Sequence, residues 1–143
     1  ALVWQNNLRA QQDLGWARQA NPTTTGGAYQ QFENGTMVWR QDTSQIYVFF
    51  NDGTWRSFAD TFKEGNRESD PALSPPGGKL QPIRGFGKVW REHDGLRDKL
   101  GWAIAKETSQ PAEIHAFERG AIMRFGPLLF IAVGVDTDQG TWY

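Results

Sequence analysis

An internal repeat constrains this chain of 143 residues more than any other feature of its sequence. Residues 14–17 read Leu-Gly-Trp-Ala, and the same four residues return at 100–103, in each case after a Val-Trp pair at the same spacing. Two further matches follow in the same order, a Phe-Glu-x-Gly segment and a Gly-Thr-Trp segment. Because the matches stay in order and nearly in register, we predict two degenerate copies of one structural unit, residues 3–57 and 89–143.

Each unit begins with a helical pattern and continues with signals for β-strands. The helices are expected at residues 5–13 and 91–99, and the Gly of Leu-Gly-Trp-Ala suits a helix C-terminus. Asn34-Gly35 and Asp52-Gly53 are hairpin signals flanked by apolar runs. The sequence therefore predicts a mainly β fold with two short helices, in which two pseudo-equivalent helix-plus-β-hairpins units pack as one domain.

The stretch between the units, residues 58–88, has no partner in the repeat. It contains several Pro and Gly residues among charged ones, a composition typical of an irregular connection. We therefore expect a crossing loop there. The length of the chain suits one continuous core, so residues 1–143 are expected to form a single domain.

Composition excludes several classes of function. The net charge of -1 argues against nucleic acid as a partner, because tracking phosphates requires an excess of Lys and Arg. The longest apolar run, about residues 128–133, is far shorter than the roughly 20 residues of a membrane span, so no membrane insertion is expected. Cysteine is absent, and His93 and His115 are the only histidines. No cofactor and no metal site are therefore expected.

Two carboxylates, Glu33 and Glu118, occupy matching positions in the repeat. Paired carboxylates carry out glycoside hydrolysis, but that reaction needs them in different environments. Residues at equivalent turns would share one environment, which favours a turn role. The sequence offers no catalytic residues, and we expect a protein that is not an enzyme.

The repeat also sorts the aromatic residues into two groups. Residues present in both copies are best explained by the shared fold, and we assign them to the core. Trp39 has no aromatic counterpart, because Arg124 stands at its position in the second unit. The core group comprises Trp4 and Trp90, Trp16 and Trp102, Trp55 and Trp142, and Phe32 and Phe117.

Alternation along residues 46–50 adds two aromatic residues to Trp39. Tyr47 and Phe49 face opposite to Ile46, Val48 and Phe50 in a strand, and aligning the Gly-Thr-Trp ends places them against Gly134 and Asp136. We therefore expect Tyr47 and Phe49 to point outward, onto a neighbouring element or into a ligand site.

Flat aromatic rings beside polar side chains bind sugars by stacking and hydrogen bonding. The predicted ligand-binding set is Trp39, Tyr47, Phe49, Arg40, Gln41 and Gln45. An equally weighted alternative is that these aromatic residues pack beneath the crossing loop.

The repeated pattern resembles the LGFP repeats of bacterial envelope proteins. The resemblance rests on Leu-Gly-Trp-Ala, on residues 32–39 and on the apolar strand that follows, and it covers residues 14–48 and 100–131. Here Ala17 and Ala103 stand where that family usually has Pro. The resemblance implies an extracellular or cell-envelope module that binds polysaccharide or cell-wall glycan, often beside a catalytic domain.

Three hypotheses for function follow. The first is a non-catalytic carbohydrate-binding module within a larger extracellular protein. The second is a structural or protein-interaction module that uses an exposed aromatic strand. The third, less favoured, is a small glycan-cleaving enzyme.

Overall fold

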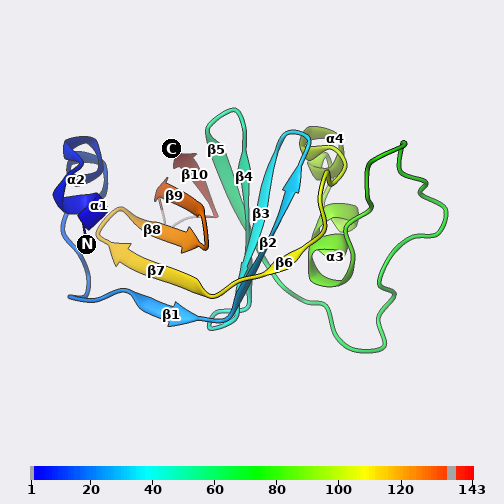
Figure 1. Ribbon diagram of the computed structural model, residues 1–143, viewed down its shortest axis with the longest axis horizontal. Helices are drawn as coiled ribbons and strands as arrows, with labels where there is room; N and C mark the ends of the chain where they lie inside the picture. Colours follow the sequence, from blue (N-terminus) through cyan, green and yellow to red (C-terminus); the bar gives the residue numbers. More distant parts are fainter. Residues whose placement is uncertain (1, 135–137) are drawn as a thin grey trace.

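The computed structural model describes residues 2–134 and 138–143, and this part of the chain is mainly β, as predicted. Its ten strands form one antiparallel sheet in the order β1-β7-β8-β9-β10-β5-β4-β3-β2-β6, with four short helices (Figure 1). The strands are β1 (Thr23–Thr25), β2 (Gly27–Phe32), β3 (Gly35–Arg40), β4 (Gln45–Phe50), β5 (Thr54–Ala59), β6 (Thr108–Ser109), β7 (Ala112–Phe117), β8 (Gly120–Phe125), β9 (Leu128–Val133) and β10 (Gln139–Trp142). The helices are α1 (Leu2–Gln5), α2 (Leu8–Leu14), α3 (Arg84–Glu92) and α4 (Leu96–Leu100).

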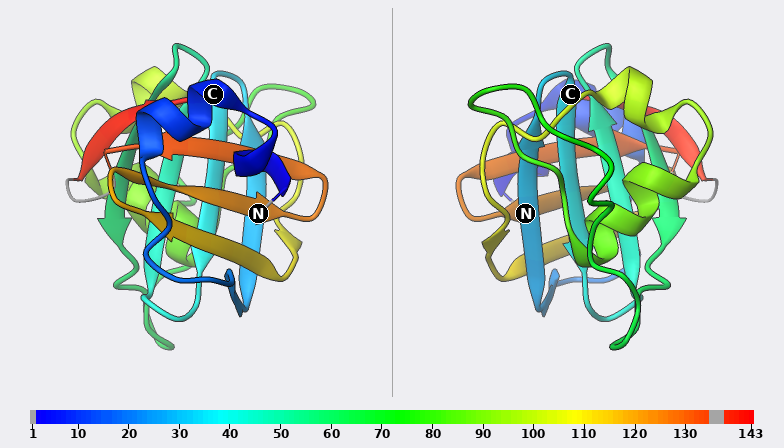
Figure 2. Two further views of the ribbon diagram at one scale, coloured as in Figure 1. Left: turned by 90° about the vertical axis from the view of Figure 1, so that its left-hand side faces the viewer. Right: turned by 90° about the vertical axis from the view of Figure 1, so that its right-hand side faces the viewer.

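The sheet bends into two layers that are joined where β5 pairs with β10. Figure 1 shows β7, β8 and β9 running across the direction of β2 to β5, which is the arrangement of orthogonally packed sheets. Apolar side chains from both layers fill the space between them, among them Val38, Phe49, Met123 and Phe130. A helix pair covers the outer face of each layer (Figure 2). The molecule therefore has four layers, which Figure 1 shows side by side, with three apolar interiors.

Each helix pair lies over strands from the other half of the sequence. Ala10 and Leu14 of α2 pack with Phe117, Ile122 and Ile131 of β7, β8 and β9. Helices α3 and α4 pack over β2 to β5 in the same manner. The short strands are exchanged too, because β1 pairs with β7 and β6 pairs with β2. The two halves of the sequence are thus interleaved rather than placed side by side.

Backbone hydrogen bonds fix the ends of α2 and α4 to hairpin turns. The amide of Arg119 donates to the carbonyl of Leu14 at 2.9 Å, and the amide of Asn34 donates to that of Leu100 at 3.0 Å. Glycine is required next to both contacts. A Cβ at Gly35 would collide with the backbone carbonyl of Phe49 and would lie 2.9 Å from Leu100 Cδ1, so glycine permits the close approach of both β4 and this leucine.

The predicted helix endings are confirmed. Gly15 and Gly101, with φ of 78° and 79°, end α2 and α4, and their amides cap the helices. The predicted continuous helices are interrupted, however. Asn7 starts α2 by accepting a hydrogen bond from the amide of Ala10, and Gly95 separates α3 from α4 in a left-handed conformation.

The predicted crossing loop, residues 58–88, is shorter than expected at both ends. Strand β5 continues to Ala59, and α3 already begins at Arg84. Phe86 of this helix is buried against the sheet. The apolar spacing of Phe86, Val89 and Trp90 extends the helix back into the segment that the Pro and Gly content had marked as irregular.

Four of the residues assigned to the core are fully inside, namely Phe32, Trp55, Trp90 and Phe117. The remaining ones, apart from Trp16, are partly buried. The core assignment of Trp16 is wrong, because its side chain is 71% exposed. Trp102 is sheltered by the segment around Leu80, which pairs with Ala103, whereas no described segment lies over Trp16 in that way.

Candidate functional site

The structure splits the predicted ligand-binding set between the two faces of the first sheet layer. Tyr47 and Phe49 are 4% and 0% exposed, so the prediction that they form an outward platform is wrong. Phe49 stacks on Phe130 of the other layer with ring centroids 4.2 Å apart. Of the two expected surroundings, the neighbouring element is the one observed, and it is a sheet layer rather than the crossing loop.

The physical reason for this error is a shift of register between the two halves. Phe50 lies opposite Gly35 in the first half, and Val133 lies opposite Gly120 in the second. Counted from these pairs, Tyr47 corresponds to Phe130 rather than to Gly134. Asp136, the residue matched to Phe49 from the sequence, lies outside the described residues.

Two polar members of the predicted set, Arg40 and Gln45, lie beside Tyr47, and the third, Gln41, is in a turn. Arg40 forms a two-pronged ion pair with Asp42 at 2.8 and 2.7 Å, which holds the pKa of the Asp42 carboxyl below its usual value. Gln45 accepts a hydrogen bond from the Tyr47 hydroxyl at 3.1 Å. Gln41 is exposed in the turn between β3 and β4. These three side chains do not lie with Trp39.

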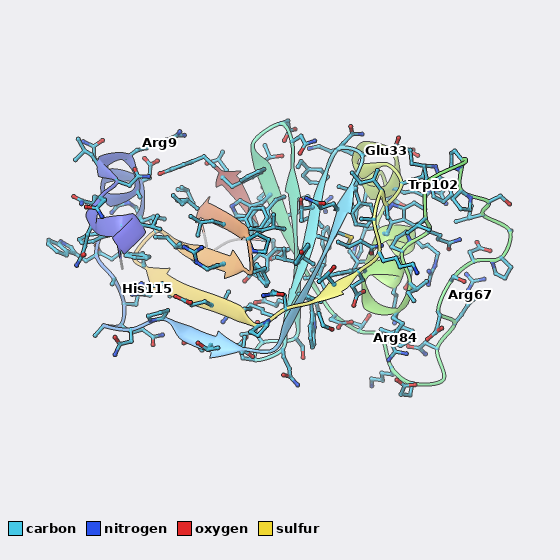
Figure 3. The ribbon with its side chains drawn as sticks, viewed as in Figure 1. Arg9, Glu33, Arg67, Arg84, Trp102 and His115 are labelled. Carbon is cyan, nitrogen blue, oxygen red and sulfur yellow. The ribbon has the colours of Figure 1, made fainter. Side chains whose placement is uncertain are left out.

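Trp39 faces the helices and lines a pocket of about 290 Å³. The pocket lies where the ends of β3, β4 and β5 meet the start of α3, and Figure 3 marks this place by Arg84. Trp39 also packs against the apolar core on that side. The pocket is lined by Trp39, Ile46, Asp60, Phe62, Arg84, Gly85, Phe86 and Glu107.

The indole N–H of Trp39 is buried and has no hydrogen-bond partner within the described part of the chain. A buried donor without a partner costs roughly 1–3 kcal/mol, so proteins rarely retain one without a use for it. Four other tryptophans donate from the indole nitrogen to backbone carbonyls, as Trp90 does to Gly101 at 2.8 Å. They are Trp4, Trp55, Trp90 and Trp142. Trp39 therefore combines a buried donor that has no partner among the described residues with a side chain that lines a pocket.

Negative charge predominates among the polar groups of this pocket. Asp60 and Glu107 contribute carboxylates, and burial raises the pKa of the Glu107 carboxyl although its side chain is still exposed at the rim. Nearby Arg84 acts to lower that pKa, and Asp60 acts to raise it. The Arg84 guanidinium is itself engaged by Glu64 at 2.6 Å and Glu68 at 2.9 Å.

Six of the residues that make this pocket were missed by the sequence analysis. Asp60, Phe62, Arg84, Gly85 and Phe86 lie at the two ends of the segment expected to be an irregular connection, and Glu107 precedes β6. Only the chain's return from β5 to α3 brings them next to Trp39. The available sequence signal was the absence of an aromatic counterpart to Trp39.

Glu33 and Glu118 lie in hairpin turns, as predicted. Glu118 accepts a hydrogen bond from the amide of Trp16 at 2.8 Å. Glu33 accepts one from the amide of Trp102 at 2.8 Å, and Figure 3 labels these two residues. Each carboxylate thus fixes the residue that follows a helix-ending glycine. Among the residues described, no three His, Cys, Asp or Glu side chains are grouped as metal ligands, and no helix is long and apolar enough to cross a membrane.

Comparisons with known proteins found no relative of this chain. No protein-family model matches it, and neither a curated protein nor a solved structure does.

Proposed function

We propose that this protein is a non-catalytic carbohydrate-binding module and that the pocket at Trp39 holds a sugar ring of a polysaccharide. The observation that carries the proposal is that Trp39, whose buried indole N–H has no partner among the described residues, lines a pocket that also contains carboxylates. A sugar presents an apolar C–H face and a rim of hydroxyls. The aromatic side chains suit the face, whereas the carboxylates of Asp60 and Glu107 suit the hydroxyls.

The charge of the pocket narrows the class of glycan. Asp60 and Glu107 are accompanied by one cation, Arg84, which two other carboxylates already engage. A uronic acid would meet like charges there, which is unfavourable in a partly buried site. We therefore infer a neutral polysaccharide, whose hydroxyls donate to the two carboxylates.

A panel of insoluble neutral and acidic polysaccharides tests this proposal through pull-down of the purified protein. Retention on a neutral polymer is expected, with weaker retention on polymers of uronic acids. Trp39→Ala should weaken that binding by roughly 1–3 kcal/mol, the size of an aromatic stacking contact. Trp16→Ala is the matched control, because Trp16 is exposed on the opposite helix layer.

A second variant separates binding from folding, because Trp39 also packs on the core. Trp39→Phe keeps an aromatic ring on the core and removes the N–H donor together with part of the ring surface, so it should fold and still bind less tightly. If Trp39→Phe and Trp39→Ala both retain wild-type binding, or if no polysaccharide of the panel retains the protein, the proposal is wrong.

The paired contacts around the helix ends support a further part of this proposal, namely that the halves are degenerate copies with exchanged helices. Trp4 donates to the Gly15 carbonyl at 2.9 Å and Trp90 to that of Gly101 at 2.8 Å, in line with the repeated sequence. Together with the resemblance to LGFP repeats, this favours an extracellular or cell-envelope location beside a catalytic partner.

A further inference from the structure

A segment of the chain covers the end of α4, and it provides a template for reading the surface at the end of α2. Leu80 and Ala103 exchange two backbone hydrogen bonds, of 2.9 and 3.1 Å, and Leu80 and Trp102 both pack against the core. Lys79, next to Leu80, approaches Glu33 to 4.0 Å. Residues 79–80 therefore add a strand-like contact to the edge formed by Ala103.

The surface at Ala17 has the same components without the covering segment. Ala17 pairs with Phe117 on one side, just as Ala103 pairs with Phe32. Its own N–H and C=O face the other way, and they have no hydrogen-bond partner among residues 2–134 and 138–143. Ala17 is exposed, whereas Ala103 is 0% exposed.

Apolar and charged groups surround the exposed backbone of Ala17. Trp16 and Leu8 are 71% and 68% exposed, which is high for large apolar side chains. With Trp4 they line an open pocket of about 360 Å³. Glu118 and Arg119 both line this pocket, and Glu118 has the place that Glu33 has beside Lys79. The Arg119 guanidinium already donates to the carbonyls of Asp13 and Gln12, so the Glu118 carboxylate is left to complement a basic residue.

We propose that this surface, formed by Trp4, Leu8, Trp16, Ala17 and Glu118, binds an extended peptide that carries a basic residue followed by a leucine. The leucine pairs with Ala17 through two backbone hydrogen bonds and covers Trp16, and the basic residue lies beside Glu118. Addition of a strand to an open edge is a common mode of peptide recognition. The surface lies on the helix layer opposite the pocket at Trp39, so this proposal does not depend on sugar binding (Figure 2).

A synthetic peptide with the sequence of residues 75–82, Pro-Pro-Gly-Gly-Lys-Leu-Gln-Pro, tests the proposal with the complete chain. Its fluorescence anisotropy should show saturable binding. N-methylation of the leucine amide should weaken binding by roughly tenfold, because it removes one of the two backbone hydrogen bonds and crowds the edge. Trp16→Ala should weaken it similarly. Ile104→Ala, which also truncates an exposed apolar side chain, should leave binding unchanged.

Four results would overturn the proposal. The first is an absence of saturable binding, and the second is binding that survives both N-methylation and Trp16→Ala. The third is that Trp16→Ala leaves peptide binding intact but lowers retention on polysaccharide, since the surface would then hold glycan. The fourth is self-association in sedimentation that Trp16→Ala abolishes, since the surface would then join two copies of the chain.

Discussion

Trp90 and Trp16 differ sharply in burial, and this difference determines what each contributes to the free energy of unfolding. Trp90 is 0% exposed and donates to a backbone carbonyl, so Trp90→Ala should cost roughly 3–5 kcal/mol. Trp16→Ala should cost less than about 1 kcal/mol, because only its contact with Trp4 is lost. Urea unfolding of both variants measures the contrast. Equal losses would show that Trp16 is covered in solution.

The carboxyl of Glu107 should make stability depend on pH. Its pKa is raised in the folded protein by burial, so the folded state holds this proton more tightly than the unfolded state does. Stability is therefore lost as pH rises from the ordinary glutamate range through the raised pKa. Glu107→Gln should remove that loss and match or exceed the wild type at pH 7, as urea unfolding between pH 4 and 7 would reveal. A variant that is less stable than the wild type at pH 7 but equal to it at pH 4 would contradict the raised pKa.

At this scale the sequence predicted that Glu33 and Glu118 lie in turns, but it did not predict which of the repeated aromatic residues are buried. Trp39 lies at a pocket, but recurrence in the repeat did not distinguish buried Trp90 from exposed Trp16. Burial depends on what the rest of the chain lays over a residue. For Trp102 that cover comes from the segment around Leu80, which has no counterpart in the repeat.

Glu33 and Glu118 each hold the end of a helix against a hairpin turn, and we call each of these contacts a joint. Removal of either carboxylate leaves one backbone amide, that of Trp102 or Trp16, without its acceptor. Glu118→Ala and Glu33→Ala should each cost about 1–2 kcal/mol. The double variant should lose the sum, because the two joints share no contact. Thermal unfolding of the three variants tests this, and a double variant no worse than either single one would mean that the joints are coupled.

Strand positions were predictable from turn signals and alternation, but what the strands face was not. The alternation along β4 correctly separated Ile46 from Tyr47, and the two residues belong to different apolar interiors. One face is covered because the sheet bends upon itself, and the other because α3 and α4 pack over it. Bending follows from the pairing of β5 with β10 across distant parts of the chain, and local sequence patterns carry no record of that pairing.

The interleaving of the two halves predicts how the whole molecule responds to a cut. A protease site placed between Gly77 and Gly78 lies in an open part of the loop, where a Cβ would meet nothing within 4 Å. After cleavage the two pieces should stay together and unfold as one unit, since Leu14 and Phe117 share one apolar interior. Size-exclusion chromatography and circular dichroism follow this. The pieces expressed separately should be unfolded, and two independently folded fragments would refute the interleaved arrangement.

Interleaving also sets when the protein can fold while it is being made. The carbonyl of Gln12 receives its hydrogen bond from Arg119, 107 residues later in the chain. At a synthesis rate of roughly 5–20 residues per second, the apolar side of α2 waits roughly 5–20 seconds for β8 to leave the ribosome. During that time Leu14 has nothing native to pack against. We therefore expect α2 to reach its native packing only after most of the chain has been translated.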